Sequence, residues 1–149
     1  AYVRRQRQMC IRDSLNSQKG NEIKENPNAT MCFHWKSLLR QIRIVGTIEQ
    51  VDDKISNEYF NSRAYDSRIG AWASKQSQTL LDREKLIERW QKYQNEFKEN
   101  VRRPDFWGGI RIKPVQIEFW ADGQYRLHDR FVWERQAGEK VWTTRRLFP

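Results

Sequence analysis

The 149-residue chain has little of what disulfide-rich, fibrous or membrane-spanning proteins require. Its two cysteines, Cys10 and Cys32, are too few for a disulfide framework or a four-cysteine zinc site, and they indicate reduced thiols in a cytoplasmic protein. Seven glycines and four prolines exclude collagen-like and linker-like chains. No apolar run approaches the roughly 18 residues of a membrane helix, so we expect no membrane partner. The length suits one domain.

Sequence motifs for common chemistries are also scarce. The two histidines, His34 and His128, have no cysteine or carboxylate at metal-ligand spacing, so no metal site is predicted. The sequence has no P-loop, no G-x-S-x-G and no G-x-G-x-x-G motif. Hydrogen-bond donors and aromatic residues without an obvious nucleophile favour a cofactor enzyme, in which the protein positions and polarises the reactants.

Lysine and arginine number 28 against 19 acidic residues, and the net charge of +9 implies an anionic partner. Residues 1–14 contain four arginines and one aspartate without a periodic apolar face. We therefore expect residues 1–15 to be a leader that is disordered or foreign to the fold, and residues 16–149 to be the domain. The sequence has no dense basic stripe or RNP-type strand, so no nucleic-acid partner is predicted. A basic RNA-binding module is the alternative that also explains the charge and the aromatic residues.

Hydrophobic periodicity predicts both helices and strands. The expected helices are 16–26, 52–63 and 82–100, and the expected strands are 31–35, 41–50, 115–120, 125–134 and 140–145. The Asp122–Gly123 and Ala137–Gly138 pairs are hairpin signals between the last strands. Short antiparallel strands with a few helices predict an α+β fold built around a small barrel.

The last part of the sequence contains a candidate cationic site. Arg126, His128 and Arg130 alternate, so on a strand their side chains would share one face and could bind an anion or an electron-rich ring. A solvated edge strand is the alternative interpretation. Trp120 and Trp133 lie nearby in the sequence, and a cationic face beside aromatic residues favours the binding site.

A second candidate site combines a phenol, a guanidinium and a hydroxyl group. Tyr59 and Arg63 are neighbours at i and i+4 on an expected helix, and Ser67 follows in the next turn. All three are hydrogen-bond donors, and a guanidinium can bind a phosphate through two hydrogen bonds. Ordinary packing on a helix surface is the alternative.

Two further segments contain donors that suit an anion. Gln76 and Ser77 lie between two helices and could donate to a ligand or cap the next helix. Lys19, near the start of a helix, could hold an anion together with backbone N–H groups, unless that start is a plain N-cap.

These segments belong to a longer series of motifs. The matching stretches are Arg40–Gly46, Tyr59–Arg63, Asp66–Ser77, Phe106–Gly109, Gln116–Trp120, Arg126–Arg130 and Arg145–Leu147. The residues in these stretches and the order of the stretches resemble the pyridoxamine 5′-phosphate oxidase family, from about Asn16 to Pro149. The resemblance implies an FMN-binding split β-barrel, antiparallel and Greek-key-like with flanking helices, that forms a homodimer with FMN at the interface.

The resemblance also implies roles for the candidate residues. The expected FMN contacts are Lys19, Gln41, Gln76, Ser77, Trp120 and Arg130. Tyr59, Arg63 and Ser67 would hold the substrate phosphate, and Arg126 and His128 would face the pyridine ring as catalytic residues. The implied reaction oxidises pyridoxamine or pyridoxine 5′-phosphate to pyridoxal 5′-phosphate while O2 is reduced to H2O2. A split-barrel flavin-binding protein with another activity is the alternative.

The chain departs from the family in two places. Gln18 stands in the Ser17–Lys19 stretch where the family usually has an arginine, which predicts weaker FMN binding. Residues 1–14 carry no part of the resemblance, whereas family members have the first barrel strands there. We therefore expect an N-terminally truncated domain that lacks these strands.

Overall fold

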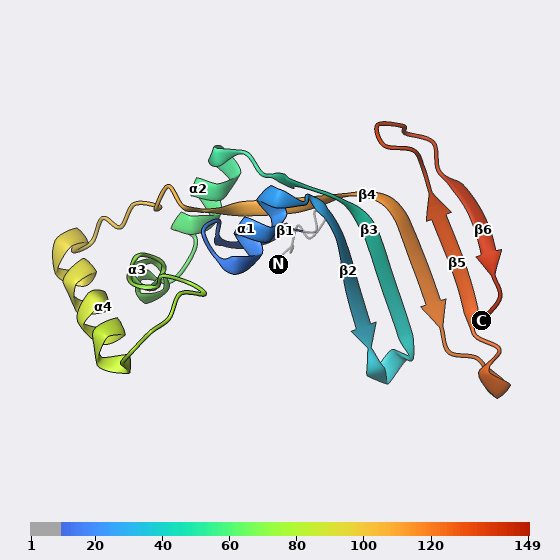
Figure 1. Cartoon of the computed structure of the whole chain (residues 1–149), viewed down its shortest axis with the longest axis horizontal. Coiled ribbons are helices and arrows are strands. Elements are labelled where there is room, and N and C mark those ends of the chain that lie inside the picture. The colour runs from blue at the N-terminus through green and yellow to red at the C-terminus, as the bar shows by residue number, and fades with distance from the viewer. Residues whose placement is uncertain (1–9) are drawn as a thin grey trace. The chain divides into compact units, whose positions relative to one another are not determined.

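The computed structural model describes residues 10–149 (Figure 1). Contacts within the chain divide these residues into two compact units. Unit 1 consists of residues 10–26 together with Gln50–Arg111, and unit 2 consists of Pro27–Glu49 together with Ile112–Pro149. We describe each unit by itself.

Unit 1 is mainly helical. Its helices are α1 (Gln18–Glu25), α2 (Asp53–Asn61), α3 (Tyr65–Ala73) and α4 (Arg83–Phe97). Three of them begin at a polar N-cap whose side chain accepts a backbone N–H, namely Ser17 for α1, Asp52 for α2 and Asp82 for α4. Such caps satisfy donors that the first helical turn leaves unpaired.

The core of unit 1 is aromatic. Phe60, Ile69, Val101 and Trp107 are buried, and the edge of the Phe60 ring meets the Trp107 ring at a centroid distance of 5.1 Å. The Trp72 indole N–H donates to the carbonyl of Arg102 at 2.8 Å, so this large ring has a partner for its polar atom. The core fixes α2 and α3 beside the strand that begins at Trp107.

That strand, β4 (Trp107–Ala121), runs through both units. In unit 1 its first residues pair antiparallel with β1 (Cys10–Ser14), with Ser14 opposite Trp107. Close packing requires glycine near its start, because a Cβ at Gly109 would lie 2.4 Å from a methyl carbon of Val51.

Unit 2 is a sheet. Its strands are β2 (Asn28–Trp35), β3 (Arg40–Gln50), the remainder of β4, β5 (Asp129–Glu134) and β6 (Thr143–Leu147). They follow the order β2-β3-β4-β5-β6, and the pairs β2–β3, β4–β5 and β5–β6 are antiparallel. Two short 3-10 turns, η1 (Lys36–Leu38) and η2 (Gln124–Arg126), occur in the connections. The predicted α+β class with an antiparallel sheet and flanking helices is confirmed.

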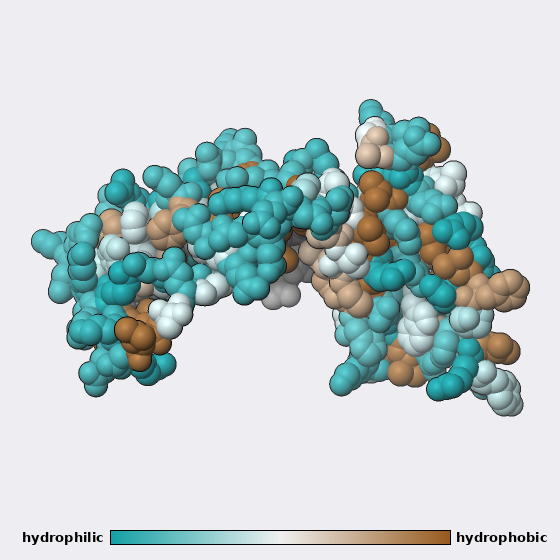
Figure 2. All heavy atoms as spheres, in the orientation of Figure 1, coloured by the Kyte–Doolittle hydropathy of each residue, from teal (hydrophilic) through white to brown (hydrophobic). Residues whose placement is uncertain are grey.

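Large hydrophobic side chains of this sheet are exposed. Figure 2 shows hydrophobic residues among hydrophilic ones over the part of the chain that contains β4 to β6. Phe33 stacks on Trp35 at 5.9 Å, and Phe119 meets Trp133 at 6.4 Å. Phe131, directly opposite Phe119 in the strand register, is also exposed. An uncovered apolar surface of this kind is typical of an interaction site.

Strand β4 begins at Trp107 and β6 spans Thr143–Leu147, where strands were predicted over 115–120 and 140–145. The structure differs from the sequence predictions in three further segments. Helix α3 is not among the helices predicted from the sequence, because Gly70 and the lack of a capping side chain at Ala64 hide its helical pattern. Residues Cys10–Ser14 were assigned to a leader outside the fold, but they form β1 and pair with β4. Residues 1–9 of that leader lie outside the described part of the chain.

The third difference concerns the connection between β4 and β5. A strand was predicted to begin at residue 125, but β5 begins at Asp129, and Tyr125 and Arg126 have left-handed backbone conformations with φ of 57° and 64°. The prediction that Arg126 and His128 alternate with Arg130 on one strand face is therefore wrong. The connection is longer than a two-residue hairpin because Ala121 pairs with Asp129.

None of the helices within residues 10–149 combines the length and the apolar character needed to cross a membrane. Over the same residues, no cluster of His, Cys, Asp or Glu has the size to hold a metal ion.

Candidate functional site

The predicted site residues fall into two groups according to the unit that contains them. Those in unit 1 are Lys19, Tyr59, Arg63, Ser67, Gln76 and Ser77. Those in unit 2 are Gln41, Trp120, Arg126, His128 and Arg130.

In unit 2, three of the predicted residues line one cavity of about 280 Å³. Gln41 on β3, Trp120 on β4 and Arg130 on β5 share this cavity with Arg43 and Glu118. Strand pairing explains the grouping, because Trp120 lies directly opposite Arg130 in the β4–β5 register. The cavity therefore combines an amide, an indole and two guanidinium groups, which suits an aromatic ligand with hydrogen-bond acceptors.

Glu118 is buried in the wall of this cavity and binds both arginines. One carboxylate oxygen accepts from Arg130 Nε at 2.7 Å, and the other accepts from Arg43 Nη2 at 2.9 Å. The hydrogen bond from Arg130 is the main cause that holds the pKa of Glu118 below its usual value, against the opposing effect of burial. Arg130 also donates through Nη1 to the carbonyl of Phe148 at 3.1 Å.

His128 lies against Trp120 in the same unit. Their ring centroids are 4.8 Å apart, and His128 Nδ1 is 3.1 Å from a carboxylate oxygen of Asp122. The Gly123 N–H also lies within hydrogen-bond distance of Nδ1, at 3.3 Å. Arg126 is exposed in the turn before His128. The structure therefore brings His128 to Trp120 and leaves Arg126 accessible to a ligand.

In unit 1, Tyr59 and Arg63 both contact the ring of Trp107. The Tyr59 ring stacks on the Trp107 ring at 6.2 Å, and the Arg63 guanidinium carbon lies 5.1 Å from the Trp107 ring centroid. Arg63 Nη1 is buried and has no hydrogen-bond partner among the described residues. A buried donor without an acceptor is costly in a folded protein, so this atom suits an anionic ligand. Ser67 is exposed near the start of α3.

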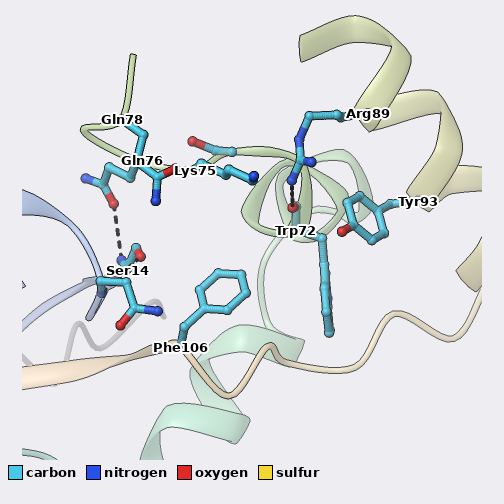
Figure 3. Close-up of a pocket in the computed structure, with 10 residues that line it drawn as sticks. Ser14, Trp72, Lys75, Gln76, Gln78, Arg89, Tyr93 and Phe106 are labelled. Atoms are coloured by element: carbon cyan, nitrogen blue, oxygen red, sulfur yellow. Dashed lines mark hydrogen bonds between the residues drawn. The ribbon is translucent and has the colours of Figure 1, made fainter. Parts of the chain in front are cut away.

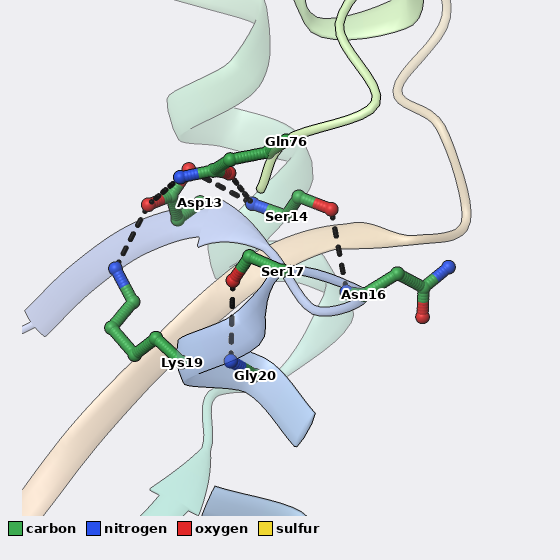
Figure 4. Close-up of polar contacts among 7 residues, drawn as sticks. All are labelled: Asp13, Ser14, Asn16, Ser17, Lys19, Gly20 and Gln76. Carbon is green, nitrogen blue, oxygen red and sulfur yellow. Dashed lines mark hydrogen bonds and ion pairs between the residues drawn. The ribbon is translucent and has the colours of Figure 1, made fainter. Parts of the chain in front are cut away.

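Lys19 and Gln76 converge on the same oxygen atom (Figure 4). Lys19 Nζ and Gln76 Nε2 each lie 2.8 Å from Asp13 Oδ2. Burial raises the pKa of Asp13, but hydrogen bonds from Lys19, Gln76 and the Ser14 N–H outweigh it and lower the pKa overall. The two predicted cofactor donors therefore already form an anion-binding pair, and in this structure the anion is a carboxylate.

Gln76 also borders a second cavity of about 280 Å³ in unit 1. Figure 3 shows the rings of Trp72, Tyr93 and Phe106 around this cavity, with Lys75 and Gln76 on the loop that follows α3. Gln76 Oε1 accepts from the Ser14 N–H at 3.2 Å. Its neighbour Ser77 is exposed and has a left-handed φ of 69°. No contact in the described residues tests the role of Ser77, which stays a prediction.

Sequence reasoning did not identify Arg43 and Glu118. Arg43 is 75 residues from Glu118 in the chain, so only the strand order brings the two side chains together. The available signal was a carboxylate inside the largely apolar stretch Val115–Trp120, since a charged residue in a buried strand normally has a partner.

Comparisons with known proteins match the whole length of the chain. The family described as "Pyridoxamine 5'-phosphate oxidase" matches residues 1–121, and the "Pyridoxine 5'-phosphate oxidase C-terminal dimerisation region" matches residues 107–149. The first match includes residues 1–14, in which the sequence analysis found no resemblance. A pyridoxine/pyridoxamine 5′-phosphate oxidase of Pelagibacter ubique is 49% identical over 138 residues, which are 91% of this chain and 66% of that protein.

Two solved structures are similar in fold. PhzG from Burkholderia lata, in complex with tetrahydrophenazine-1-carboxylic acid, has a TM-score of 0.85 and 28% identity, over 94% of this chain and 68% of that one. A pyridoxamine 5′-phosphate oxidase-related, FMN binding protein from Nostoc punctiforme has a TM-score of 0.72 and 13% identity, over 100% of this chain and 77% of that one. Both are consistent with the predicted split-barrel fold.

The chain spans about two thirds of the length of the curated relatives it matches. The family match over residues 1–121 and the identity of nearly one half with a curated relative leave no doubt about its relationship. The chain belongs to the pyridoxamine 5′-phosphate oxidase family.

Proposed function

We propose that the chain is an FMN-dependent enzyme that oxidises pyridoxamine 5′-phosphate or pyridoxine 5′-phosphate to pyridoxal 5′-phosphate in the cytoplasm. O2 accepts the electrons and is reduced to H2O2. The observation that carries the proposal is the family match, supported by the buried, unpartnered Arg63 Nη1 beside Trp107, which suits a substrate phosphate.

The residues present fit FMN. Its phosphate is an anion, and Lys19 and Gln76 already hold a carboxylate oxygen at 2.8 Å each. Its ring system is aromatic with an acceptor-rich edge, which matches the indole of Trp120 with the donors Gln41 and Arg130 around one cavity. When bound, FMN would supply the two-electron acceptor for substrate oxidation and pass the electrons to O2.

The substrate would be held by its phosphate and oriented at its ring. Tyr59, Arg63 and Ser67 would donate to the phosphate, and the Arg63 guanidinium would supply the strongest, charge-assisted hydrogen bonds. Arg126, exposed in the connection before β5, would orient the pyridine ring, which is the positioning that turnover requires. His128 would face the same ring, with its imidazole packed against Trp120.

Arg130 would contribute electrostatic stabilisation. Its guanidinium is anchored by Glu118 and by the carbonyl of Phe148, so its position in the cavity is set before a ligand binds. A preorganised positive charge stabilises negative charge that develops nearby during reduction of a bound ring.

A homodimer with FMN at its interface is part of the proposal. The family's dimerisation region corresponds to residues 107–149, which include β4 to β6. The exposed rings of Phe119, Phe131 and Trp133 supply an apolar surface there that a second copy would cover.

The test is to purify the chain, record its flavin absorbance after incubation with FMN, and measure pyridoxal 5′-phosphate and H2O2 formation from each substrate. Arg63→Met should raise KM strongly because the phosphate loses its cation, while Arg102→Met, an exposed arginine on the same unit, should not. Bound FMN without oxidation of either substrate would favour a split-barrel flavin-binding protein with another activity. The similarity to PhzG, whose structure contains a tricyclic ligand, is the specific support for this alternative. RNA binding that falls steeply with salt, without flavin, would favour the RNA-binding module.

A further inference from the structure

Glu118 is a buried carboxylate that the proposed reaction does not use. Only 5% of the residue is exposed, and it sits opposite Val132, which is fully buried. Both of its oxygens are engaged by arginines from neighbouring strands, Arg43 on β3 and Arg130 on β5. Charged residues are seldom buried unless they are paired, so the arrangement calls for a reason beyond packing.

The contacts fix one arginine more firmly than the other. Arg130 is held at two points, through Nε to Glu118 and through Nη1 to the Phe148 carbonyl, and its side chain is 27% exposed. Arg43 has one contact to Glu118, and its side chain is 45% exposed. Among the described residues, the Nη2 group of Arg130 has no hydrogen-bond acceptor, although it belongs to a guanidinium on the cavity wall.

The charges explain why a carboxylate is needed between the two arginines. Without Glu118, two guanidinium groups on one small cavity would repel each other and turn toward water. With Glu118 present, the three groups carry a net charge of +1, and a cation remains available to an anionic or electron-rich ligand. Because Glu118 binds Nε and the Phe148 carbonyl accepts from Nη1, the Nη2 group of Arg130 is left for that ligand.

We propose that Glu118 is a positioning residue that fixes the Arg130 guanidinium in the flavin cavity and so sets both the affinity for FMN and its reduction potential. This inference depends on the proposed function, in which Arg130 contacts FMN. In this proposal Glu118 acts through the Arg130 guanidinium that it holds.

Positioning and simple charge have opposite effects on the reduction potential. If Glu118 acted only through its charge, its removal would make the cavity more positive, stabilise the reduced flavin and raise the potential. If Glu118 holds Arg130 in place, its removal lets the guanidinium turn toward solvent, and the potential falls. The sign of the shift therefore separates the two roles.

The experiment uses the full chain with three variants. Glu118→Gln removes the charge, Glu118→Asp keeps the charge but is too short to reach both arginines, and Glu134→Gln is the matched control. Glu134 also pairs with an arginine, Arg145 at 3.0 Å, but outside the cavity and with its side chain 39% exposed. FMN affinity is measured by flavin fluorescence and the reduction potential by titration against redox dyes, with thermal unfolding of the FMN-free chain to verify folding.

We expect both Glu118 variants to bind FMN about tenfold or more weakly, which is the effect of one lost charge-assisted hydrogen bond. Both should lower the reduction potential, and Glu134→Gln should match the wild type in both measurements. In an Arg130→Met background, Glu118→Gln should have little further effect on FMN affinity, because the group that it positions is gone.

Three results would overturn the inference. A raised potential in Glu118→Gln would assign the effect to charge alone, and an undiminished effect of Glu118→Gln in the Arg130→Met background would show action independent of Arg130. Glu118→Asp serves as the second variant if Glu118→Gln does not fold, and wild-type behaviour in it would exclude positioning. If the wild-type chain binds no FMN, the proposed function fails as well; if it binds FMN and the Glu118 variants behave like Glu134→Gln, only this inference fails.

Discussion

Replacement of Asp13 by asparagine should tighten FMN binding about tenfold, since a tenfold change in affinity corresponds to about 1.4 kcal/mol. The Asp13 carboxylate occupies the position between Lys19 and Gln76 that the proposed function gives to the FMN phosphate. Asparagine has nearly the same shape, so the substitution removes the negative charge and changes little else. The FMN phosphate would then meet two donors that are no longer committed to a resident anion.

The magnitude follows from the exposure of the pair. The side chains of Lys19 and Asp13 are 42% and 32% exposed, so the local dielectric lies between that of water and that of a protein surface. Two negative charges about 5 Å apart in a dielectric of about 40 repel by about 1.7 kcal/mol. Loss of the Lys19–Asp13 ion pair lowers the stability of the free protein by only about 0–1 kcal/mol, because exposed ion pairs contribute little. The net effect on FMN affinity is therefore about one order of magnitude.

The assay is an FMN titration followed by quenching of flavin fluorescence, at low and at high salt. Asp52→Asn is the control, because Asp52 caps α2 and asparagine caps a helix equally well. The gain in Asp13→Asn should shrink as salt screens the repulsion. An unchanged or weaker affinity in Asp13→Asn would refute the reasoning and would separate the FMN phosphate from Lys19 and Gln76.

Four other changes have defined outcomes. Gln18→Arg should also tighten FMN binding in the same titration, by adding a cation beside Lys19, and no tightening would count against the assigned phosphate site. Arg126→Ala should fold and bind FMN yet lose most of its kcat, and unchanged turnover would remove Arg126 from the mechanism. Because the pKa of Glu118 is lowered from 4.5 in the folded chain, its stabilising contribution is present above that value and is lost as pH falls through the lowered pKa. The Tm of the wild type should accordingly fall more steeply than that of Glu118→Gln in acid, and parallel curves would contradict this. Phe60→Ala should lower the free energy of unfolding by about 3–5 kcal/mol in urea, because Phe60 is fully buried, and a loss below about 1 kcal/mol would show that the core tolerates the cavity.

Elements with strong local patterns were predictable from the sequence. The helix predicted over 82–100 matches α4 (Arg83–Phe97), since Trp90, Tyr93 and Phe97 recur at helical spacing after the capping Asp82. The strand predicted over 41–50 matches β3, whose isoleucines alternate with polar residues. In both cases the local sequence and the tertiary structure favour the same conformation.

What could not be predicted depends on contacts between distant segments or on unusual backbone conformations. The turn at Tyr125 and Arg126 uses left-handed φ values that non-glycine residues seldom adopt, so the strand pattern around them was misleading. The pairing of Glu118 with Arg43 requires knowledge of the strand order. The grouping of Gln41, Trp120 and Arg130 was implied by the family resemblance, and strand register explains how the fold achieves it.

The left-handed backbone at Arg126 sets stability and activity against each other at this position. An L-residue in this conformation costs the fold about 1–2 kcal/mol relative to glycine, and a long cationic side chain does not recover that cost through local contacts. Substitution by glycine at this position should therefore make the folded chain more stable while it removes the group assigned to orient the substrate. Selection for thermostability alone would favour glycine here, which gives a more stable but less active protein. An arginine retained at this position would therefore indicate selection for activity.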